Sequence, residues 1–515
     1  MEAALEGRIT TQPELERWKR EVSKRFGLDG LPKNADLLGQ AAPGERDRLK
    51  LLVRKPTRTL SGVAVVAAMT SPAPCPHGVC IPCPGGLSRR KATPQSYTGK
   101  EPAALRAGQH GYDPYDQVRA RLSQLAEIGH PLDKVDLIVM GGTITSRPLG
   151  YQYWFVKRCI EAMNDYPSQS DGTVERKCFS EVARENETST VRNVGTTFET
   201  RPDWCGPGQI KNLLLLGGTK VELGVQSTDD ALLEKMRRGH TVRDAASANR
   251  ALREAGLKVG FHMMPGLPGS DPQQDLRSFR DLFEKEEFRP DYLKIYPALV
   301  VDGTPLCDLY RRGEFLPLGN EEAAELVSRI KEMVPPYTRI QRVQRDIPAH
   351  QIVAGVKKSN LRQLARERLE SRGKECRCIR CREAGLRGVE DMEVSFGDLV
   401  YRACGGTEHF LSYEGEDGTL AGFLRLRLGE EARVRELHVY GPMMPLGKKG
   451  GWQHRGIGSK LLAAAEDMAR DAGYGTLLVT SGIGARPYYR RRGYVLAEPY
   501  MTKGTSKSSI RSDSF

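Results

Sequence analysis

The sequence predicts an α/β protein whose larger part is a parallel sheet curled into a full or partial barrel, followed by a smaller α/β domain. The barrel is predicted by apolar runs that recur along the chain with helical patterns between most of them, and by polar and glycine residues at the ends of those runs. The smaller domain is predicted by a change after about residue 391, where short alternating strands and a glycine-rich turn replace the repeats. An open doubly wound sheet is the alternative for the larger part.

The length and charge of the chain limit the class of protein. At 515 residues it is too long for one ordinary core, and 78 Lys and Arg against 65 Asp and Glu give a net charge of +13. This balance favours a polyanionic partner such as nucleic acid, although a generally basic surface also accounts for it. Eleven cysteines occur without an apolar leader or a run long enough to span a membrane, so we expect reduced thiols in a cytoplasmic protein with no membrane partner.

Residues 1–57 are expected to form a basic helical segment. Leu15, Trp18, Val22 and Phe26 recur at helical intervals within residues 13–26, and bases occupy the other face. Such a helix either packs on a neighbouring element or lines a groove that binds nucleic acid, which here would be tRNA.

Residues 58–346 are expected to form the barrel. The predicted strands lie at 62–69, 136–143, 196–202, 220–227, 258–269 and 291–300, and the clearest helices at 115–128 and 242–255. In such a barrel the chemistry lies at the carboxyl ends of the strands.

A cysteine motif follows the first predicted strand. Cys75, Cys80 and Cys83 form C-x-x-x-x-C-x-x-C, in a loop that prolines and glycines keep out of helix and strand. Three thiolates leave one iron of a [4Fe–4S] cluster without a protein ligand, and S-adenosylmethionine can bind at that iron. The alternatives are a zinc knuckle with His77 as fourth ligand, or buried unreactive thiols.

Polar residues end several predicted strands and are candidates for binding S-adenosylmethionine. Gly141 and Gly142 allow close approach of the backbone to a ligand, and a carboxylate or amide at a strand end can bind ribose hydroxyls or an amino group. Each could instead serve a turn, but together they favour a ligand site. The strand-end candidates are Gly141, Gly142, Thr143, Glu199, Arg201, Glu222, Gln226 and the segment 264–269.

Residues 347–390 are expected to form a basic, zinc-binding linker. Residues 337–346 and 357–382 are rich in bases, which favours an RNA or DNA groove over a solvated helical face. Cys376, Cys378 and Cys381 form C-x-C-x-x-C, one ligand short of a closed zinc site, and Cys307 is the best fourth candidate. The alternative is three surface thiols.

Residues 391–515 are expected to form a domain with an antiparallel meander, turns at 416–418 and 429–430, and a helix over 457–472. The loop before and at the start of this helix resembles the acyl-CoA loop of acetyltransferases, because several backbone N–H groups meet at a helix N-terminus. A dinucleotide loop would need a ribose-binding acid on the next strand, where none occurs. Tyr488 and Tyr489 follow that strand and are expected to meet the thioester, or simply to pack. The loop residues are Gln453, His454, Arg455, Gly456, Ile457 and Gly458.

Several motifs together closely resemble the catalytic subunit of Elongator, from about residue 55 to residue 503. They are CPHGVCIPCPGG, PQSYTGKEPAA, FETRPDW, LGVQS, RGHTVR, LKIYPALV, RVQRDIP, RELHVYG and QHRGIG. The resemblance implies a radical S-adenosylmethionine partial TIM barrel, a zinc-binding linker, and a C-terminal GCN5-related acetyltransferase-like (GNAT-like) domain. It also implies that the three loop cysteines hold the cluster, that Cys307, Cys376, Cys378 and Cys381 hold zinc, and that the loop at 453–458 binds acetyl-CoA with both tyrosines.

The family modifies the wobble uridine of tRNA, and the resemblance implies that reaction here. The cluster cleaves S-adenosylmethionine, the deoxyadenosyl radical takes hydrogen from the acetyl methyl group, and the carbon radical adds to C5 of the uracil before thioester hydrolysis leaves a carboxymethyl group. Lys294 and Tyr296, at a predicted strand end, are our candidates for orienting the acetyl group or the uracil. An electron donor is required. The shorter cysteine loop and the missing N-terminal extension leave both a homodimer and the other Elongator subunits open as partners.

Two other functions fit parts of the sequence. A protein lysine acetyltransferase with a vestigial cluster domain would need a general base, for which Glu436 is the candidate. A non-catalytic RNA-binding scaffold would use the cluster and zinc structurally.

Overall fold

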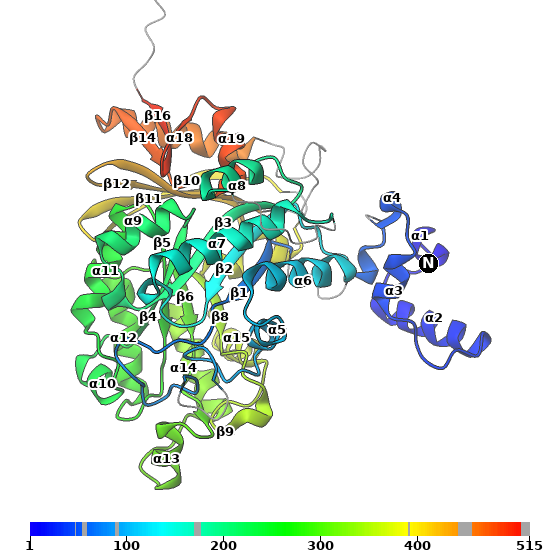
Figure 1. The fold of residues 1–515 in the computed structure, drawn as a ribbon, viewed down its shortest axis with the longest axis horizontal. Helices are drawn as coiled ribbons and strands as arrows, with labels where there is room; N and C mark the ends of the chain where they lie inside the picture. Colours follow the sequence, from blue (N-terminus) through cyan, green and yellow to red (C-terminus); the bar gives the residue numbers. More distant parts are fainter. Residues whose placement is uncertain are drawn as a thin grey trace, which may run out of the picture.

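The computed structural model describes residues 1–46, 48–53, 59–87, 92–168, 177–389, 392–440 and 456–505. These form an N-terminal group of helices, a barrel-like parallel sheet, a linker region and a C-terminal mixed sheet (Figure 1). Among the described residues, no helix is both long and apolar enough to cross a membrane.

The N-terminal helices surround a small core of their own, to one side of the parallel sheet (Figure 1). The predicted helix over 13–26 is confirmed as α2, which begins after Thr11 with a reciprocal capping box to Glu14. Leu15 is buried in this core, but Trp18 and Phe26 are 37% and 67% exposed, so the predicted apolar face is only partly covered. The elements are α1 (Glu2–Leu5), α2 (Gln12–Arg25), α3 (Asn34–Gly39), α4 (Pro43–Arg46) and η1 (Lys50–Leu52).

Seven parallel strands form the barrel sheet, in chain order and with no reversal. A doubly wound sheet reverses its strand order at a switch point, so that alternative is wrong. The two edge strands, β1 and β8, are not hydrogen-bonded to each other, so the barrel is partial. Its last strand lies within the basic stretch 337–346. The strands are β1 (Ala64–Met69), β2 (Lys134–Met140), β3 (Arg192–Thr200), β4 (Lys220–Gln226), β5 (Lys258–Met263), β6 (Tyr292–Ile295) and β8 (Arg339–Val343).

Helices cover the outside of this half-barrel and bury its outward apolar side chains in one large core. The two predicted helices are confirmed as α6 and α11; α11 begins with a capping box from Thr241 and ends before Gly256, whose φ is +78°. The elements are α5 (Pro102–Gln109), α6 (Pro114–Glu127), η3 (Ile144–Ser146), α7 (Leu149–Asn164), α8 (Phe179–Asn186), η4 (Pro202–Trp204), α9 (Pro207–Leu215), α10 (Asp230–Lys235), α11 (Val242–Glu254), α12 (Pro272–Glu284) and α14 (Asn320–Met333).

The linker packs on α14 through ion pairs. Arg368 and Arg372 of the basic stretch pair with Glu321 and Glu325, the second pair at 3.1 Å. Part of the charge that was expected to bind phosphates therefore holds the linker to α14. The elements of this region are β7 (Val300–Val301), α13 (Pro305–Arg311), η5 (Ala349–Gln351), β9 (Ile352–Ala354), α15 (Leu361–Ser371), α16 (Ile379–Arg382) and α17 (Ala384–Arg387).

The C-terminal domain is a seven-stranded mixed sheet with α18 packed on it. Its first four strands form the predicted antiparallel meander, β13 and β14 pair in parallel, and the predicted helix over 457–472 is confirmed as α18. The elements are β10 (Ser395–Ala403), β11 (Gly406–Glu414), β12 (Leu420–Leu428), β13 (Ala432–Val439), α18 (Ile457–Asp471), β14 (Thr476–Val479), η7 (Ile483–Ala485), α19 (Arg486–Arg490), β15 (Val495–Ala497) and β16 (Tyr500–Gly504).

The C-terminal domain closes the amino end of the half-barrel. His438 of β13 lies 3.0 Å from the carbonyl oxygen of Ser61, just before β1, and Arg435 donates to the carbonyl oxygen of Leu257, just before β5. In Figure 1 the orange and red sheet covers one end of the barrel strands, while α13 and β9, which follow the carboxyl ends of β6 and β8, lie at the other. The domain therefore sits opposite the end that carries the cysteine loop.

Candidate active site

The cysteine loop follows β1 at the carboxyl end of the half-barrel. Cys75, Cys80 and Cys83 line one large cavity, and the last two are buried. The His77 ring lies between the first two thiols, with Nδ1 3.1 Å from Cys75 Sγ and Nε2 2.8 Å from Cys80 Sγ. A single loop thus presents three thiols to one space, which is the arrangement that an iron–sulfur cluster with one open iron needs.

Two arginines make this end of the cavity positive. Arg238 donates to Cys80 Sγ at 3.2 Å, and Arg201, 4% exposed, has two guanidinium nitrogens with no hydrogen-bond partner among the described residues. Burial, followed by the charges of these arginines, lowers the pKa of His77 to about 3, so its ring is neutral. Cationic, partly unsatisfied groups beside three thiols fit an anionic cluster and the carboxylate of an amino-acid ligand.

His77, the fourth ligand that the zinc-knuckle alternative requires, lies beside two of the loop thiols, but the described residues of the loop do not form a closed group of four ligand atoms. Within the described ranges, two groups of Cys, His or acidic residues have ligand atoms that all lie within 4.8 Å of one another, and neither includes a cysteine of this loop.

The residues predicted to bind S-adenosylmethionine lie at different depths. Gly142 and Gln226 line the cavity at the carboxyl end of the half-barrel. A Cβ on Gly141, whose φ is +122°, would stand 2.4 Å from Thr70 Oγ1, so close packing against the end of β1 requires this glycine. Glu222 lies fully buried in the middle of β4, so its predicted position at a strand end is wrong.

A buried ion cluster occupies the middle of the half-barrel. Lys294 Nζ lies 3.0 Å from Glu199 Oε1 and forms an ion pair with Glu222, whose carboxylate also lies 2.9 Å from His262 Nε2. Burial alone would lower the pKa of Lys294, but the charge of Glu222 holds it well above its usual value. Burial, followed by the positive charge of Lys294, lowers the pKa of His262, so this ring is neutral. The ligand atoms of Glu199, Glu222 and His262 lie within 4.8 Å of one another, and the Lys294 ammonium supplies the positive charge that pairs with both carboxylates.

The second predicted catalytic residue lies one position beyond β6. Tyr296 lines the cavity, and its ring centroid is 5.6 Å from that of His262 in an edge-on arrangement. Sequence reasoning missed His262. The signal that could have found it is the occurrence of polar residues at alternate positions of several barrel strands, because alternate residues of a strand face the same side.

The acetyltransferase-like part of the site lies at the amino end. Gly456, with φ +76°, caps α18, and a Cβ on Gly458 would stand 3.0 Å from the Tyr488 hydroxyl. That hydroxyl is buried beside Ser459, and Tyr488 lines the cavity. Tyr489 packs in the domain core and also lines the cavity, whereas the side chain of Ile457 lies in that core and is not part of the lining. The predicted residues Gln453, His454 and Arg455 lie outside the described residues.

One cavity joins the two ends of the half-barrel. It measures about 1350 Å³, and its lining includes the three loop cysteines, the Lys294 cluster, and Gly456, Gly458 and Tyr488. A typical pocket for one small molecule measures roughly 300–1,000 Å³. The space is therefore large enough for more than one ligand.

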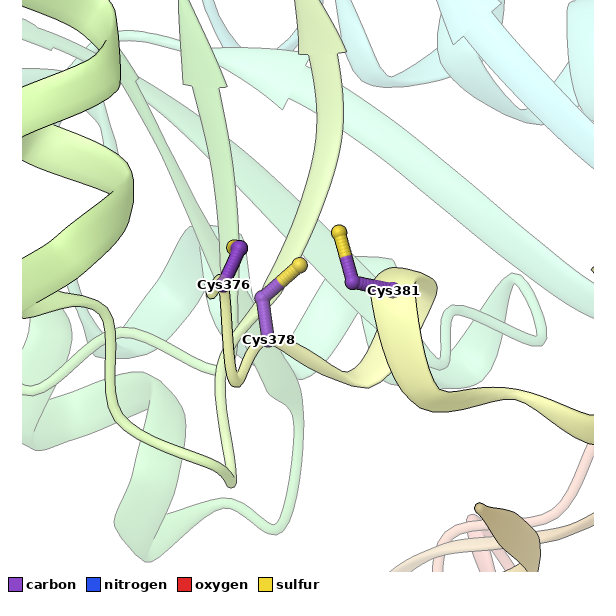
Figure 2. A group of neighbouring side chains, drawn as sticks. All are labelled: Cys376, Cys378 and Cys381. Atoms are coloured by element: carbon purple, nitrogen blue, oxygen red, sulfur yellow. The ribbon is translucent and has the colours of Figure 1, made fainter. Parts of the chain in front are cut away.

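The second cysteine motif forms a compact group beside the barrel. Figure 2 shows Cys376 and Cys378 in a loop and Cys381 on α16, with their sulfur atoms within 4.8 Å of one another. These three thiols could hold a metal ion. Cys307, the predicted fourth ligand, is not part of the group: it lies on α13, in a different apolar cluster with Leu306.

A buried network of charges joins the two domains, and sequence reasoning did not find it. Asp291 at the start of β6 accepts two hydrogen bonds from Arg435 of β13, at 2.7 and 2.8 Å, and Arg435 also pairs with Glu408 at 2.8 Å. Its members are four arginines and four carboxylates, so the set by itself carries no net charge. We call this set the interdomain ion network: Arg253, Arg425, Arg427, Arg435, Glu254, Asp291, Glu408 and Glu436.

The network includes Glu436, the candidate base for lysine acetylation. Its carboxylate accepts hydrogen bonds from the Tyr292 hydroxyl and from Arg425, the latter at 2.9 Å. Burial would raise its pKa, but the charges of Lys258 and Arg425 hold the pKa of Glu436 at about 2. A carboxylate with so low a pKa and two fixed partners is a poor base for an amine.

Family models match nearly the whole chain. They are described as the ELP3 N-terminal domain (residues 1–60), the radical SAM superfamily (75–282), the radical SAM C-terminal domain (290–371) and the acetyltransferase (GNAT) family (383–494). A protein of Methanocaldococcus jannaschii named "tRNA uridine(34) acetyltransferase" is 46% identical, over 96% of this chain and 95% of its own. The chain belongs to the Elp3 family, the catalytic subunits of Elongator.

Other Elp3 proteins are similar over comparable lengths. "Elongator complex protein 3" of Homo sapiens is 39% identical, over 95% of this chain and 93% of its own. The solved structure of Methanocaldococcus infernus Elp3 with an N-terminal deletion (1–46) aligns with a TM-score of 0.74 and 42% identity, over 86% of this chain and 99% of that one. Membership in the Elp3 family confirms the resemblance seen in the sequence and the predicted combination of a radical SAM half-barrel with a GNAT domain.

Proposed function

We propose that this Elp3 protein places a carboxymethyl group on C5 of the wobble uridine of tRNA, with S-adenosylmethionine and acetyl-CoA as co-substrates. The observation that carries the proposal is the single cavity that reaches from the cysteine loop to Tyr488. Two chemistries that share a substrate need such a connection. The names of the relatives, which specify uridine 34 of tRNA and acetyl transfer, support the choice of substrates.

In this proposal Cys75, Cys80 and Cys83 hold a [4Fe–4S] cluster, which when bound supplies the one-electron chemistry that activates the acetyl methyl group. Gly142 and Gln226, which line the same end of the cavity, hold the polar groups of S-adenosylmethionine. Arg201 binds its carboxylate through the two nitrogens that lack partners among the described residues.

Lys294 is the proposed positioning group for the reaction. Its ammonium can donate to the acetyl carbonyl oxygen or to a uracil oxygen while Glu199 and Glu222 keep it charged. Tyr296 packs beside it. For the atoms to balance, one methyl hydrogen leaves with the deoxyadenosyl group, the C5 hydrogen of uracil leaves as a proton with return of one electron, and water cleaves the thioester to free CoA.

Cys376, Cys378 and Cys381 are proposed to hold a structural zinc ion that fixes the linker. The predicted electron donor would act at the cysteine loop. A homodimer, accessory subunits and a cytoplasmic location remain expectations from the sequence.

The experiment uses protein reconstituted with iron and sulfide in the absence of oxygen, then mixed with tRNA, S-adenosylmethionine and acetyl-CoA whose methyl group carries three deuterium atoms. We expect carboxymethyluridine with two deuterium atoms and deoxyadenosine with one, both measured by mass spectrometry. Cys80→Ser should abolish both products, and Cys178→Ser, at an exposed cysteine outside the cavity, should not. A parallel reaction also contains a histone peptide, and labelled acetyl-lysine on that peptide with no label in tRNA would instead establish the acetyltransferase alternative.

A further inference from the structure

We propose that the acyl-pantetheine arm of acetyl-CoA passes through the interior of the half-barrel, from its amino end to Lys294. The inference rests on the proposed function, because it assumes that an acyl-CoA is the carbon source. The structure shows two parts of the site at opposite ends of the same strands, and the arm is the one flexible part of that substrate able to join them.

The interior of the half-barrel is polar and incompletely filled. Such interiors are normally packed with layers of large apolar side chains. Here the inward positions include Asp136, Thr197 and Lys220, and Val65 on β1 lines the cavity with 45% of its surface exposed. An amide-containing chain would find hydrogen-bond donors and acceptors along this path.

The lengths agree. β2 has seven residues, so the interior is roughly 23 Å from end to end. Glu222, in the Lys294 cluster, lies two residues above the start of β4, or roughly 7 Å from the amino end. The extended acyl-pantetheine arm has as many backbone bonds as roughly five residues of peptide and spans about 16 Å. An arm that enters the half-barrel at the amino ends of its strands is therefore long enough to bring its acetyl group to Lys294, and too short to cross the whole interior.

The arrangement also gives each substrate its own approach. The nucleotide end of CoA stays outside, at the C-terminal domain, while S-adenosylmethionine approaches from the carboxyl end. In this arrangement the side between β1 and β8, the two strands of the sheet that are not hydrogen-bonded to each other, is left for the uridine. Arg342 and Arg345 of the β8 segment line the cavity on that side and can hold phosphates of the RNA.

The test compares the binding of two ligands to the unreacted protein. Acetyl-CoA carries the arm, and adenosine 3′,5′-bisphosphate carries only the nucleotide end. Val65→Trp and Ala67→Phe each place a bulky side chain inside the half-barrel on its edge strand. We expect each variant to bind acetyl-CoA at least 10-fold more weakly by calorimetry and to bind the bisphosphate with unchanged affinity. Val400→Trp, on the exposed face of β10 and away from the cavity, is the matched control and should change neither.

A second measurement locates the acyl end directly. A photoreactive diazirine-acyl-CoA should cross-link to β4, β5 or β6, as mapped by mass spectrometry of peptides. Unchanged acetyl-CoA affinity in both variants, equal loss of both ligands, or cross-links confined to β13 and α19 would overturn the inference. Failure of the unsubstituted protein to bind either ligand would instead remove acetyl-CoA from the proposed function.

Discussion

Replacing Asp291 by Asn should loosen the contact between the two domains. The substitution removes one negative charge from the interdomain ion network, which otherwise balances four arginines against four carboxylates. Asp291 is fully buried and accepts hydrogen bonds from Arg435 at 2.7 and 2.8 Å and from the Val259 N–H at 2.9 Å. The variant therefore leaves one buried guanidinium charge without compensation.

The size of the effect follows from this burial. Removing one member of a buried ion pair costs about 3–5 kcal/mol. Asn keeps the volume of the side chain and an oxygen that can still accept from Val259, so we expect the lower end, about 3 kcal/mol. Hydrogen exchange suits the measurement, because a chain of several domains need not unfold in one step. Amides of β13 should exchange roughly 100-fold faster in the variant, since 1.36 kcal/mol corresponds to a factor of ten.

Two further variants make the test specific. Asp291→Asn combined with Arg435→Gln removes one charge of each sign, and we expect it to recover more than half of the lost protection. Asp302→Asn breaks an exposed pair with Arg311 and should cost less than about 1 kcal/mol. Exchange of β13 in Asp291→Asn at the rate of the unsubstituted protein, or a double variant no better than the sum of the single ones, would contradict the balanced-charge reasoning.

Three other predictions address the site and the linker. Because the pKa of Glu436 in the folded protein, about 2, lies below its ordinary value of about 4.5, its stabilisation is complete above about pH 4.5 and lost as the pH falls toward 2. Denaturant midpoints of Glu436→Gln should vary less over that range. Lys294→Met should lower carboxymethyluridine formation at least about 100-fold, as measured by nucleoside mass spectrometry; near-normal product would remove its positioning role. Cys378→Ser should lose one equivalent of zinc, but no iron, by elemental analysis and should melt at a lower temperature, whereas zinc retained in full would place the metal elsewhere.

The helices and strands could be predicted to a large extent from local pattern. The capping box at Thr241 and the apolar spacing that follows it mark the whole of α11, because both signals lie within the helix itself. The cysteine loop could also be predicted from local pattern, because its three cysteines lie within nine residues of one another. Strand β8 was not identified as a strand, since its alternation of Arg and Gln with Ile and Val looks like a basic surface unless the interior of the barrel is known to be polar.

Positions that depend on distant partners were predicted poorly. Cys307 seemed to complete the group at Cys376, Cys378 and Cys381 because it was the best remaining cysteine, yet α13 carries it into a different apolar cluster. Glu436 seemed a suitable base because a carboxylate on a strand of an acetyltransferase-like domain is the usual candidate. Arg425 pairs with it across neighbouring strands of the same sheet, but the hydrogen bond from Tyr292 of β6 depends on how the second domain docks on the first.

The sequence by itself determined the Elp3 family, the repeated alternation of strand and helix in the larger part and the residues of both cysteine motifs, because these depend on spacing over short stretches of chain. Only the tertiary structure decided that the GNAT domain closes the amino end of the half-barrel and that one polar interior runs between the two reactive ends. The physical reason is that the contacts that hold this arrangement, such as Asp291 with Arg435, join residues 144 positions apart, and no local pattern specifies which distant charges will meet.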